Sequence, residues 1–209
     1  NMPSYQPEAY QKPGCPIIVD LNGDGLITVE DVDMKNVIPS LYWGFGNTFT
    51  YKNWDLDVFI YSQLGVDKYN DVYSWTSGRG LGNQTNNMSV YIKDVWHSEL
   101  NPNGTIPGIA YEMASVSLPG GAGTDIGYEN SSFVRVRNIT LGYNFKPNQL
   151  GALSKLLSGI RVYVDVQNPF TFTGYTGLDP EVNTGGNYKG GKAEYPQTRT
   201  FSLGAKLSF

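Results

Sequence analysis

The sequence predicts an all-β protein whose strands form part of a large transmembrane antiparallel β-barrel with long extracellular loops. Three observations carry this prediction: five stretches alternate apolar with polar or small residues, short and long connections alternate between them, and aromatic residues gather near their ends. Alternation with a period of two is typical of strands, and helical periodicity is scarce. The alternation alone fits a soluble sandwich equally well, so the choice between a sandwich and a transmembrane barrel depends on the connections between the strands.

The five predicted strands span residues 43–51, 54–63, 133–145, 160–167 and 200–209. In the second of them Trp54, Leu56 and Val58 alternate with Asp55 and Asp57. The apolar rows are expected to face lipid and the polar rows the lumen of the barrel. The polar row of the second and fourth strands comprises Asp55, Asp57, Tyr61, Gln63, Arg161, Tyr163, Asp165 and Gln167.

The connections distinguish the two sides of the membrane. A two-residue turn at Lys52-Asn53 and a moderate turn at 146–159 alternate with long loops at 65–132 and 173–197. Soluble domains seldom carry a structureless loop of roughly 65 residues, whereas outer-membrane barrels combine short periplasmic turns with long outside loops. We therefore expect residues 1–41 to form an extracellular segment and 42–209 to supply strands and loops. Because five strands cannot close a barrel, other strands must complete it.

The composition excludes several other classes of protein. No stretch approaches the roughly 20 apolar residues that a membrane-spanning helix needs. A net charge of -4 gives no basic surface for nucleic acid. One Cys excludes an internal disulfide framework, and one His makes multi-histidine metal sites and histidine catalysis poor hypotheses. The first residues carry no basic and then apolar run, so we expect the sequence to begin within a longer protein.

A twelve-residue loop near the start matches the pattern of a calcium-binding loop. Asp20, Asn22 and Asp24 stand at positions one, three and five, and Gly25 at position six permits a sharp turn. Leu26 offers its carbonyl at position seven. Asp31 stands at position twelve, where EF-hands carry Glu, so the loop is more similar to dockerin-type loops than to EF-hands. The predicted calcium ligands are therefore Asp20, Asn22, Asp24, Leu26 and Asp31. A metal-free loop of Asx turns built from the same residues is the alternative.

The other candidate residues are weaker. The second strand is followed by four candidate ligand-binding residues, Tyr69, Tyr73, Trp75 and Arg79. Flat aromatic rings beside polar groups suit stacking on a ligand such as a sugar. The alternative is that these loop aromatics pack against each other. His97 fits a surface histidine better than a catalytic base, and Cys15 fits an inert thiol. Asp179 and Glu181 form the one tempting carboxylate pair, but within Asp-Pro-Glu a turn-forming role explains them better than acid–base catalysis. No catalytic residue is predicted, and the chain is not expected to be an enzyme.

Several stretches resemble the C-terminal part of the SusC/RagA-type TonB-dependent outer-membrane transporters. Besides the loop at 20–31, they are 42–49 (YWGFGNTF), 51–56 (YKNWDL), 132–143 (SFVRVRNITLGY), 161–168 (RVYVDVQN), 179–182 (DPEV) and 195–209. The resemblance covers nearly the whole chain at spacings that this family uses. The loop at 74–126 matches least.

The resemblance implies a 22-stranded barrel in the outer membrane of a Gram-negative cell, of which this chain supplies about five C-terminal strands. It also implies a plug, further barrel strands and a TonB-contacting region that lie outside this sequence. The implied partners are a SusD-like lipoprotein, TonB acting through the plug, outer-membrane lipid, and a glycan or peptide substrate. The function that follows is nutrient import. The alternative is a secreted, calcium-stabilised β-sandwich that binds carbohydrate or acts as an adhesin.

Overall fold

The computed structural model describes residues 3–70, 73, 88–108, 125–182 and 195–209. The chain divides into two compact units. One unit comprises Asn36–Lys68, Asn130–Asn183 and Glu194–Phe209, and the other comprises Asn1–Lys35, Tyr69–Glu129 and Thr184–Ala193. The first unit contains the main sheet.

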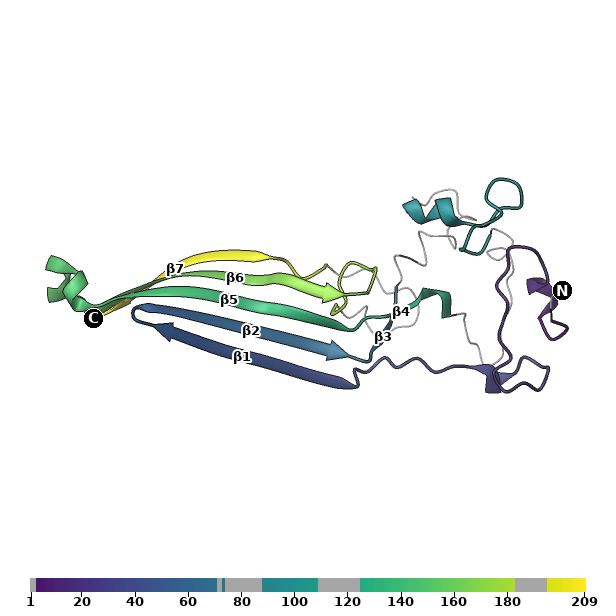
Figure 1. Ribbon diagram of the computed structural model, residues 1–209, viewed down its shortest axis with the longest axis horizontal. Helices are drawn as coiled ribbons and strands as arrows, with labels where there is room; N and C mark the ends of the chain where they lie inside the picture. Colours follow the sequence, from purple (N-terminus) through teal and green to yellow (C-terminus); the bar gives the residue numbers. More distant parts are fainter. Residues whose placement is uncertain (1–2, 71–72, 74–87, 109–124, 183–194) are drawn as a thin grey trace. The chain divides into compact units, whose positions relative to one another are not determined.

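The main sheet has five strands in the order β1-β2-β5-β6-β7, with every neighbouring pair antiparallel (Figure 1). Its members are β1 (Leu41–Tyr51), β2 (Trp54–Leu64), β5 (Phe133–Phe145), β6 (Gly159–Thr173) and β7 (Thr200–Ser208). The predicted all-β fold and all five predicted strands are confirmed. Chain order and neighbour order are the same, because each strand is followed by its antiparallel neighbour in this sheet.

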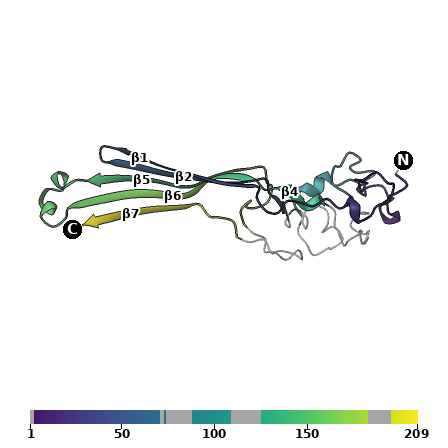
Figure 2. The same ribbon diagram turned by 90° about the horizontal axis from the view of Figure 1, so that it is seen from below.

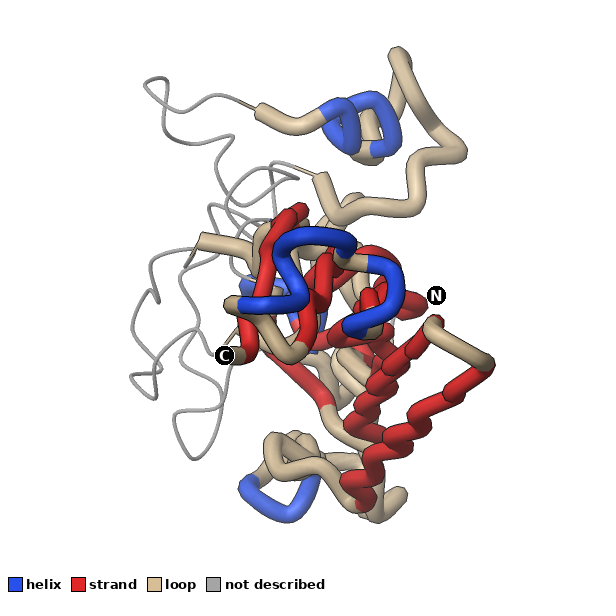
Figure 3. Tube along the Cα trace, turned by 90° about the vertical axis from the view of Figure 1, so that its left-hand side faces the viewer, coloured by secondary structure: helices blue, strands red, loops and turns tan. Residues whose placement is uncertain are grey.

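Short connections lie at one end of the sheet. Lys52 adopts a positive φ of 58° in the turn between β1 and β2, and the turn between β5 and β6 holds two short 3-10 helices, η6 (Pro147–Gln149) and η7 (Gly151–Lys155). Figure 3 looks at the sheet from this end, with η6 and η7 in blue. The long connections leave the opposite end, as the sequence predicted.

The long connection between β2 and β5 contains short elements that the sequence did not indicate. Among its described residues these are two strands that pair with each other, β3 (Asp67–Tyr69) and β4 (Tyr128–Asn130), and the 3-10 helices η3 (Val90–Asp94) and η5 (Asp125–Gly127). Strands of three residues show too few alternations to be recognised by their period.

Within the unit that holds the sheet, no second layer of described residues covers the apolar rows (Figure 2). Phe49, Phe201 and Leu203 are 57%, 71% and 77% exposed. The buried large apolar side chains of the described residues are few, namely Tyr10, Val66, Ile106, Phe133 and Leu157. A β-sandwich would need the opposite, with these rows packed into one core. Among the described residues no helix is long and apolar enough to cross a membrane.

A β-bulge interrupts the alternation of β5 at Arg137. Val136 pairs with Ile60 of β2 and Asn138 pairs with Phe59, so Arg137 is the extra residue on β5. An extra residue reverses which positions face a given side. On β6 the matching irregularity lies near Asn168, whose φ is 49°. The alternation predicted for β6 therefore stopped at Gln167, although the strand continues to Thr173.

The second unit combines the N-terminal segment with part of the long connection. It holds the 3-10 helices η1 (Glu8–Tyr10) and η2 (Val29–Asp31). The N–H of Gly108 donates to the carbonyl of Gly14 at 2.8 Å, and Lys35 Nζ lies 3.6 Å from a carboxylate oxygen of Asp125. Residues 1–35 are thus grouped with 69–129, while the extracellular role predicted for 1–41 stays a prediction.

Candidate functional site

The polar row predicted from the sequence forms one face of the sheet. Thr48, Asp57, Thr140, Asp165 and Ser202 follow one another across five strands in register. Thr48 donates a hydrogen bond to Asp57, and Thr140 Oγ1 donates to Asp165 Oδ1 at 2.6 Å. These bonds satisfy the two carboxylates within the polar face of the sheet.

An ion pair crosses this polar face near the end of the sheet that carries the short turns. Asp55 of β2 pairs with Arg161 of β6, although β5 lies between them. Arg161 Nε donates to Asp55 Oδ1 at 3.2 Å, and Asn144 Nδ2 of β5 donates to the same oxygen at 2.6 Å. Gly142 lies directly under the pair, since a Cβ there would be 2.5 Å from Asp55 Oδ2 and 2.7 Å from Arg161 Nε. The sequence predicted the face of these residues but not their pairing.

Substituting Gly142 by Ala is expected to destabilise the protein by about 1–3 kcal/mol, because the added methyl group overpacks the site and displaces the ion pair. The measurement is the denaturant midpoint of the full-length protein in detergent. The matched control is Gly46→Ala on the same face, where a Cβ would meet its nearest neighbour, Phe59, at an ordinary 3.6 Å. Equal midpoints for the two variants would contradict the role of Gly142.

A network of four charges, with Arg135 and Asp179 buried at its centre, lies at the end of the sheet where the long connections leave. The Arg135 side chain is 2% exposed, and its NH2 and NH1 groups bond Asp179 Oδ1 at 2.8 Å and Glu181 Oε2 at 2.6 Å. Its Nε donates to Thr171 Oγ1 at 2.9 Å. Arg137 reaches the other oxygen of Glu181. Two arginines and two carboxylates thus compensate one another, and Arg135 has the hydrogen bonds that a buried guanidinium needs.

Hydrogen bonds to Asp179 hold it in the ionised form. Burial alone would raise the pKa of Asp179, but the backbone N–H groups of Glu181 and Gln197 and the guanidinium of Arg135 outweigh it, and the pKa lies below its usual range. The two N–H bonds measure 2.8 Å and 2.9 Å. Asp179 and Glu181 therefore do more than form a turn. The sequence signal for this network was the pair of arginines at 135 and 137, where the apolar alternation breaks.

The predicted calcium loop is tightly turned. Gly23 and Gly25 have φ values of 78° and 80°. The Asp20 carboxylate accepts from the N–H of Gly23 at 2.7 Å and of Gly25 at 2.8 Å. Asn22 and Asp24 each accept from the N–H two residues on, at 3.0 Å and 2.8 Å. These bonds match the Asx turns of the metal-free alternative, but they leave the choice open, because a carboxylate oxygen accepts more than one bond.

The end of the loop is capped by Asp31. Its carboxylate accepts from the N–H of Leu21 and of Thr28, at 2.8 Å and 2.7 Å, and the bond from Thr28 is the main reason that the pKa of Asp31 is lowered. Asp31 and Thr28 form a capping box on η2. Within the part of the chain that the structure describes, no three His, Cys, Asp or Glu side chains are gathered closely enough to hold a metal ion.

The four predicted ligand-binding residues are only partly described, because Trp75 and Arg79 lie outside the described residues. Tyr69 packs edge-on against Tyr128, with ring centroids 5.2 Å apart. Tyr73 packs in the same way on Tyr91 at 5.5 Å. Tyr69 and Tyr73 thus make the mutual aromatic contacts that the alternative interpretation described.

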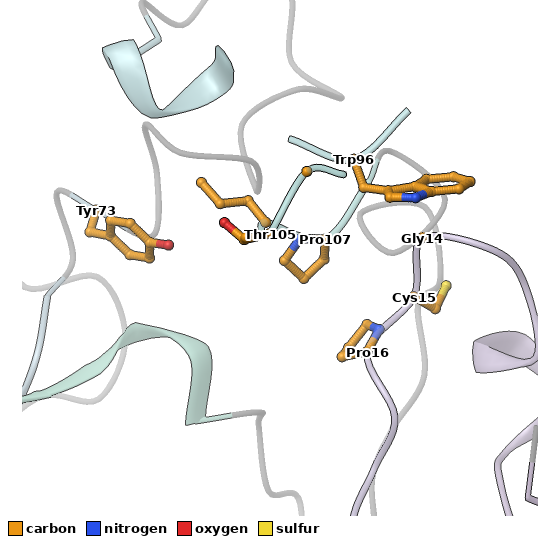
Figure 4. A pocket seen from close by; sticks show the side chains of 9 residues that line it. Gly14, Cys15, Pro16, Tyr73, Trp96, Thr105 and Pro107 are labelled. Carbon is orange, nitrogen blue, oxygen red and sulfur yellow. The ribbon is translucent and has the colours of Figure 1, made fainter. Parts of the chain in front are cut away.

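Tyr73 also lines a cavity of about 470 Å³ (Figure 4). Its described lining residues carry no charge and comprise Gly14, Cys15, Pro16, Tyr73, Trp96, Gly104, Thr105, Ile106 and Pro107. Trp96 packs closely on Gly14, where a Cβ would lie 2.7 Å from the indole ring. Trp96 therefore serves to pack the stretch 96–107 against the stretch 14–16.

His97 and Cys15 have surroundings that fit structural roles. Nδ1 of His97 accepts from the N–H groups of Glu99 and Leu100, at 3.2 Å and 3.1 Å, so the ring caps a local turn. Burial raises the pKa of the Cys15 thiol, which disfavours the reactive thiolate.

The chain is similar to receptors of one kind along nearly its whole length. It is 33% identical over 211 residues to the TonB-dependent receptor SusC of Bacteroides thetaiotaomicron, covering 98% of this chain and 19% of that protein. It is 31% identical over 206 residues to the TonB-dependent receptor P3 of Formosa agariphila, covering 94% and 19%. The chain therefore spans about a fifth of the length of these relatives. No protein-family model matches it.

Solved structures show the same arrangement of strands. The RagAB peptide importer in its open-open state matches with a TM-score of 0.64 and 25% identity, over 84% of this chain and 18% of the other. The closed-closed state of the same importer gives a TM-score of 0.65 at 24% identity. The five-stranded sheet thus has the form of a segment of a transporter barrel.

Proposed function

Because this chain is a relative, along nearly its whole length, of the SusC-type TonB-dependent receptors, we propose that it is part of the barrel of an outer-membrane nutrient importer. The chain lies in the outer membrane and crosses it with strands. Its relatives are named receptors and an importer, which agrees with the expectation that it catalyses no reaction. Import is driven through TonB, and the imported solute is a glycan or a peptide.

One observation carries the proposal, namely a single-layer sheet with one exposed apolar face and one hydrogen-bonded polar face. Val164 and Leu203 are adjacent in register on the apolar face and are 47% and 77% exposed. An apolar face of this size would be unstable in water but is stable against lipid. The polar face then lines the lumen. The secreted sandwich is not favoured, since it lacks a covering layer among the described residues.

The partners follow from the same proposal. The remaining strands and the plug of the same polypeptide complete the barrel, and TonB acts on the plug. A SusD-like lipoprotein covers the outer side, where the long connections of this chain lie. Support comes from the relatives' names and from the placement of both long connections at one end of the sheet.

Uptake by cells tests this function. The full-length protein is expressed in its host with and without tonB, and uptake of labelled oligosaccharides and oligopeptides is measured together with the amount of protein in the outer membrane. We expect uptake of one of these two solute classes that is lost without tonB, with an unchanged amount of barrel. Uptake that is equal in both strains would contradict the proposal.

We further propose that the loop at 20–31 binds one structural calcium ion. The loop contains the oxygen donors that a hard cation prefers, namely the side chains of Asp20, Asn22, Asp24 and Asp31 and the carbonyl of Leu26. The ion would reduce repulsion among three carboxylates and stiffen the segment that leads into β1. All donors belong to the loop itself, so the role is structural.

Asp24→Asn is expected to weaken calcium binding by the full-length protein, which should otherwise have a Kd of about 10⁻⁴–10⁻³ M, as for extracellular modules. Asparagine keeps the oxygen that accepts from the N–H of Leu26, so the Asx turn survives while the charge is lost. Calorimetric titration with calcium is the measurement, and Asp33→Asn, just outside the loop, is the control. Absence of binding by the unchanged protein at millimolar calcium would leave the metal-free loop.

A further inference from the structure

The segment that follows β6 is fastened to β5 by charged side chains. Arg135 on β5 bonds both Asp179 and Glu181, and Arg137 bonds Glu181 as well. The two carboxylates belong to residues 174–182, which leave the end of β6. Because Arg135 is 2% exposed, this segment cannot leave β5 without exposing a buried cation and separating it from its counter-ions.

The fastening lies on the polar face of the sheet. Arg135 stands opposite Tyr61 of β2 and Thr171 of β6 in register. Tyr61 belongs to the polar row, and its ring lies 5.4 Å from the guanidinium carbon of Arg137. The side chains that hold Asp179 and Glu181 therefore project from the lumen side of the wall. The segment lies over that side, close to the end from which the long connections leave.

Further bonds hold the same segment at other points. Lys68 Nζ donates to the carbonyl of Pro180 at 2.6 Å and also reaches the carbonyl of Val182. Asp179 Oδ2 accepts from the N–H of Gln197 at 2.9 Å, so the chain returning toward β7 is tied to the same carboxylate. A segment with this many fixed points keeps one position.

We propose that residues 174–182 form a fixed restriction inside the outer mouth of the barrel, with Arg135 as the positioning residue that holds it there. The proposal rests on the function proposed above, since a lumen exists only if the sheet is a barrel wall. Two arginines and two carboxylates compensate one another in the network, so the restriction selects solutes by their cross-section more than by their charge.

Cysteine labelling on intact cells tests this placement. The full-length protein, with its own cysteines replaced by serine, receives either Leu178→Cys within the segment or Leu100→Cys as the control. Both leucines are well exposed, at 63% and 84%. Each variant is treated with a small maleimide or with a bulky polyethylene-glycol maleimide. We expect the small reagent to label both positions and the bulky reagent to label only position 100.

The variant Arg135→Met then distinguishes the role of Arg135 in positioning residues 174–182 from an effect on the stability of the barrel. Releasing the segment should restore labelling of Leu178→Cys by the bulky reagent, whereas a loss of barrel would reduce labelling at both positions together. If Arg135→Met does not assemble, labelling of the two cysteine positions in the otherwise unchanged protein still tests whether residues 174–182 form a restriction. Equal labelling of both positions by the bulky reagent overturns the restriction. Absence of the protein from the outer-membrane fraction, measured first, would instead overturn the proposed function.

Discussion

Replacing Arg135 by methionine is expected to lower the unfolding free energy of the full-length protein by about 3–5 kcal/mol, the range for breaking a buried ion pair by removing one partner. Methionine fills a similar volume but leaves Asp179 and Glu181 without the guanidinium that bonds both of them. Asp179 is itself 5% exposed, so water compensates little of the loss. Few single substitutions on this sheet should cost more.

Denaturant unfolding in detergent, followed by tryptophan fluorescence, measures this effect. The control is Arg199→Met, since Arg199 is exposed just before β7, and such surface changes usually stay within about 0.5 kcal/mol. If Arg135→Met costs no more than Arg199→Met, the network contributes nothing to stability.

The same network implies a direction of pH dependence. The folded-state pKa of Asp179 is lowered, so the folded protein binds the proton more weakly than the unfolded chain. The stabilisation is therefore fully present above the unfolded pKa of about 4 and is lost as pH falls through the lower folded value. Arg135→Met should remove part of this acid sensitivity.

Replacing Leu203 by arginine is expected to destabilise the barrel by about 2–4 kcal/mol if the site lies near the bilayer midplane. Leu203 is 77% exposed on the apolar face of β7, so the guanidinium would face lipid instead of water or a counter-ion. Its neighbour Ser202 lies on the opposite face, in register with Asp165, and Ser202→Arg is the matched control. Unfolding of the full-length protein from lipid vesicles is the measurement. Equal effects of the two substitutions would contradict the assignment of faces.

The main sheet could be predicted from the sequence because alternation is a local property. The stretch 54–60 is recognisable as a strand with one apolar side, because Trp54, Leu56, Val58 and Ile60 alternate with other residues. The register between β2 and β5 then follows from matching their apolar sides. The two-residue turn at Lys52-Asn53 made the pairing of β1 with β2 predictable as well. The alternation of short and long connections indicated a barrel, and the family resemblance added its expected 22 strands.

The charged network could not be predicted in the same way. Arg135 and its two carboxylate partners are 44 and 46 residues apart in the sequence, and nothing local indicates that they meet. The bulge at Arg137 was visible only as a change of phase, from apolar residues at 134 and 136 to apolar residues at 139 and 141. A strand prediction based on one period treats such a change as an end of the pattern, so the side to which Arg135 belongs was left undetermined.

The ion pair over Gly142 has a mechanical consequence. Sliding one strand along its neighbour strains all the hydrogen bonds between those two strands at once, but strands that are not neighbours share no such bonds. Asp55 and Arg161 join β2 to β6 diagonally, with β5 between them, so β2 cannot slide relative to β6 unless the pair breaks. The pair therefore adds a resistance to shear between two strands that share no backbone hydrogen bonds with each other.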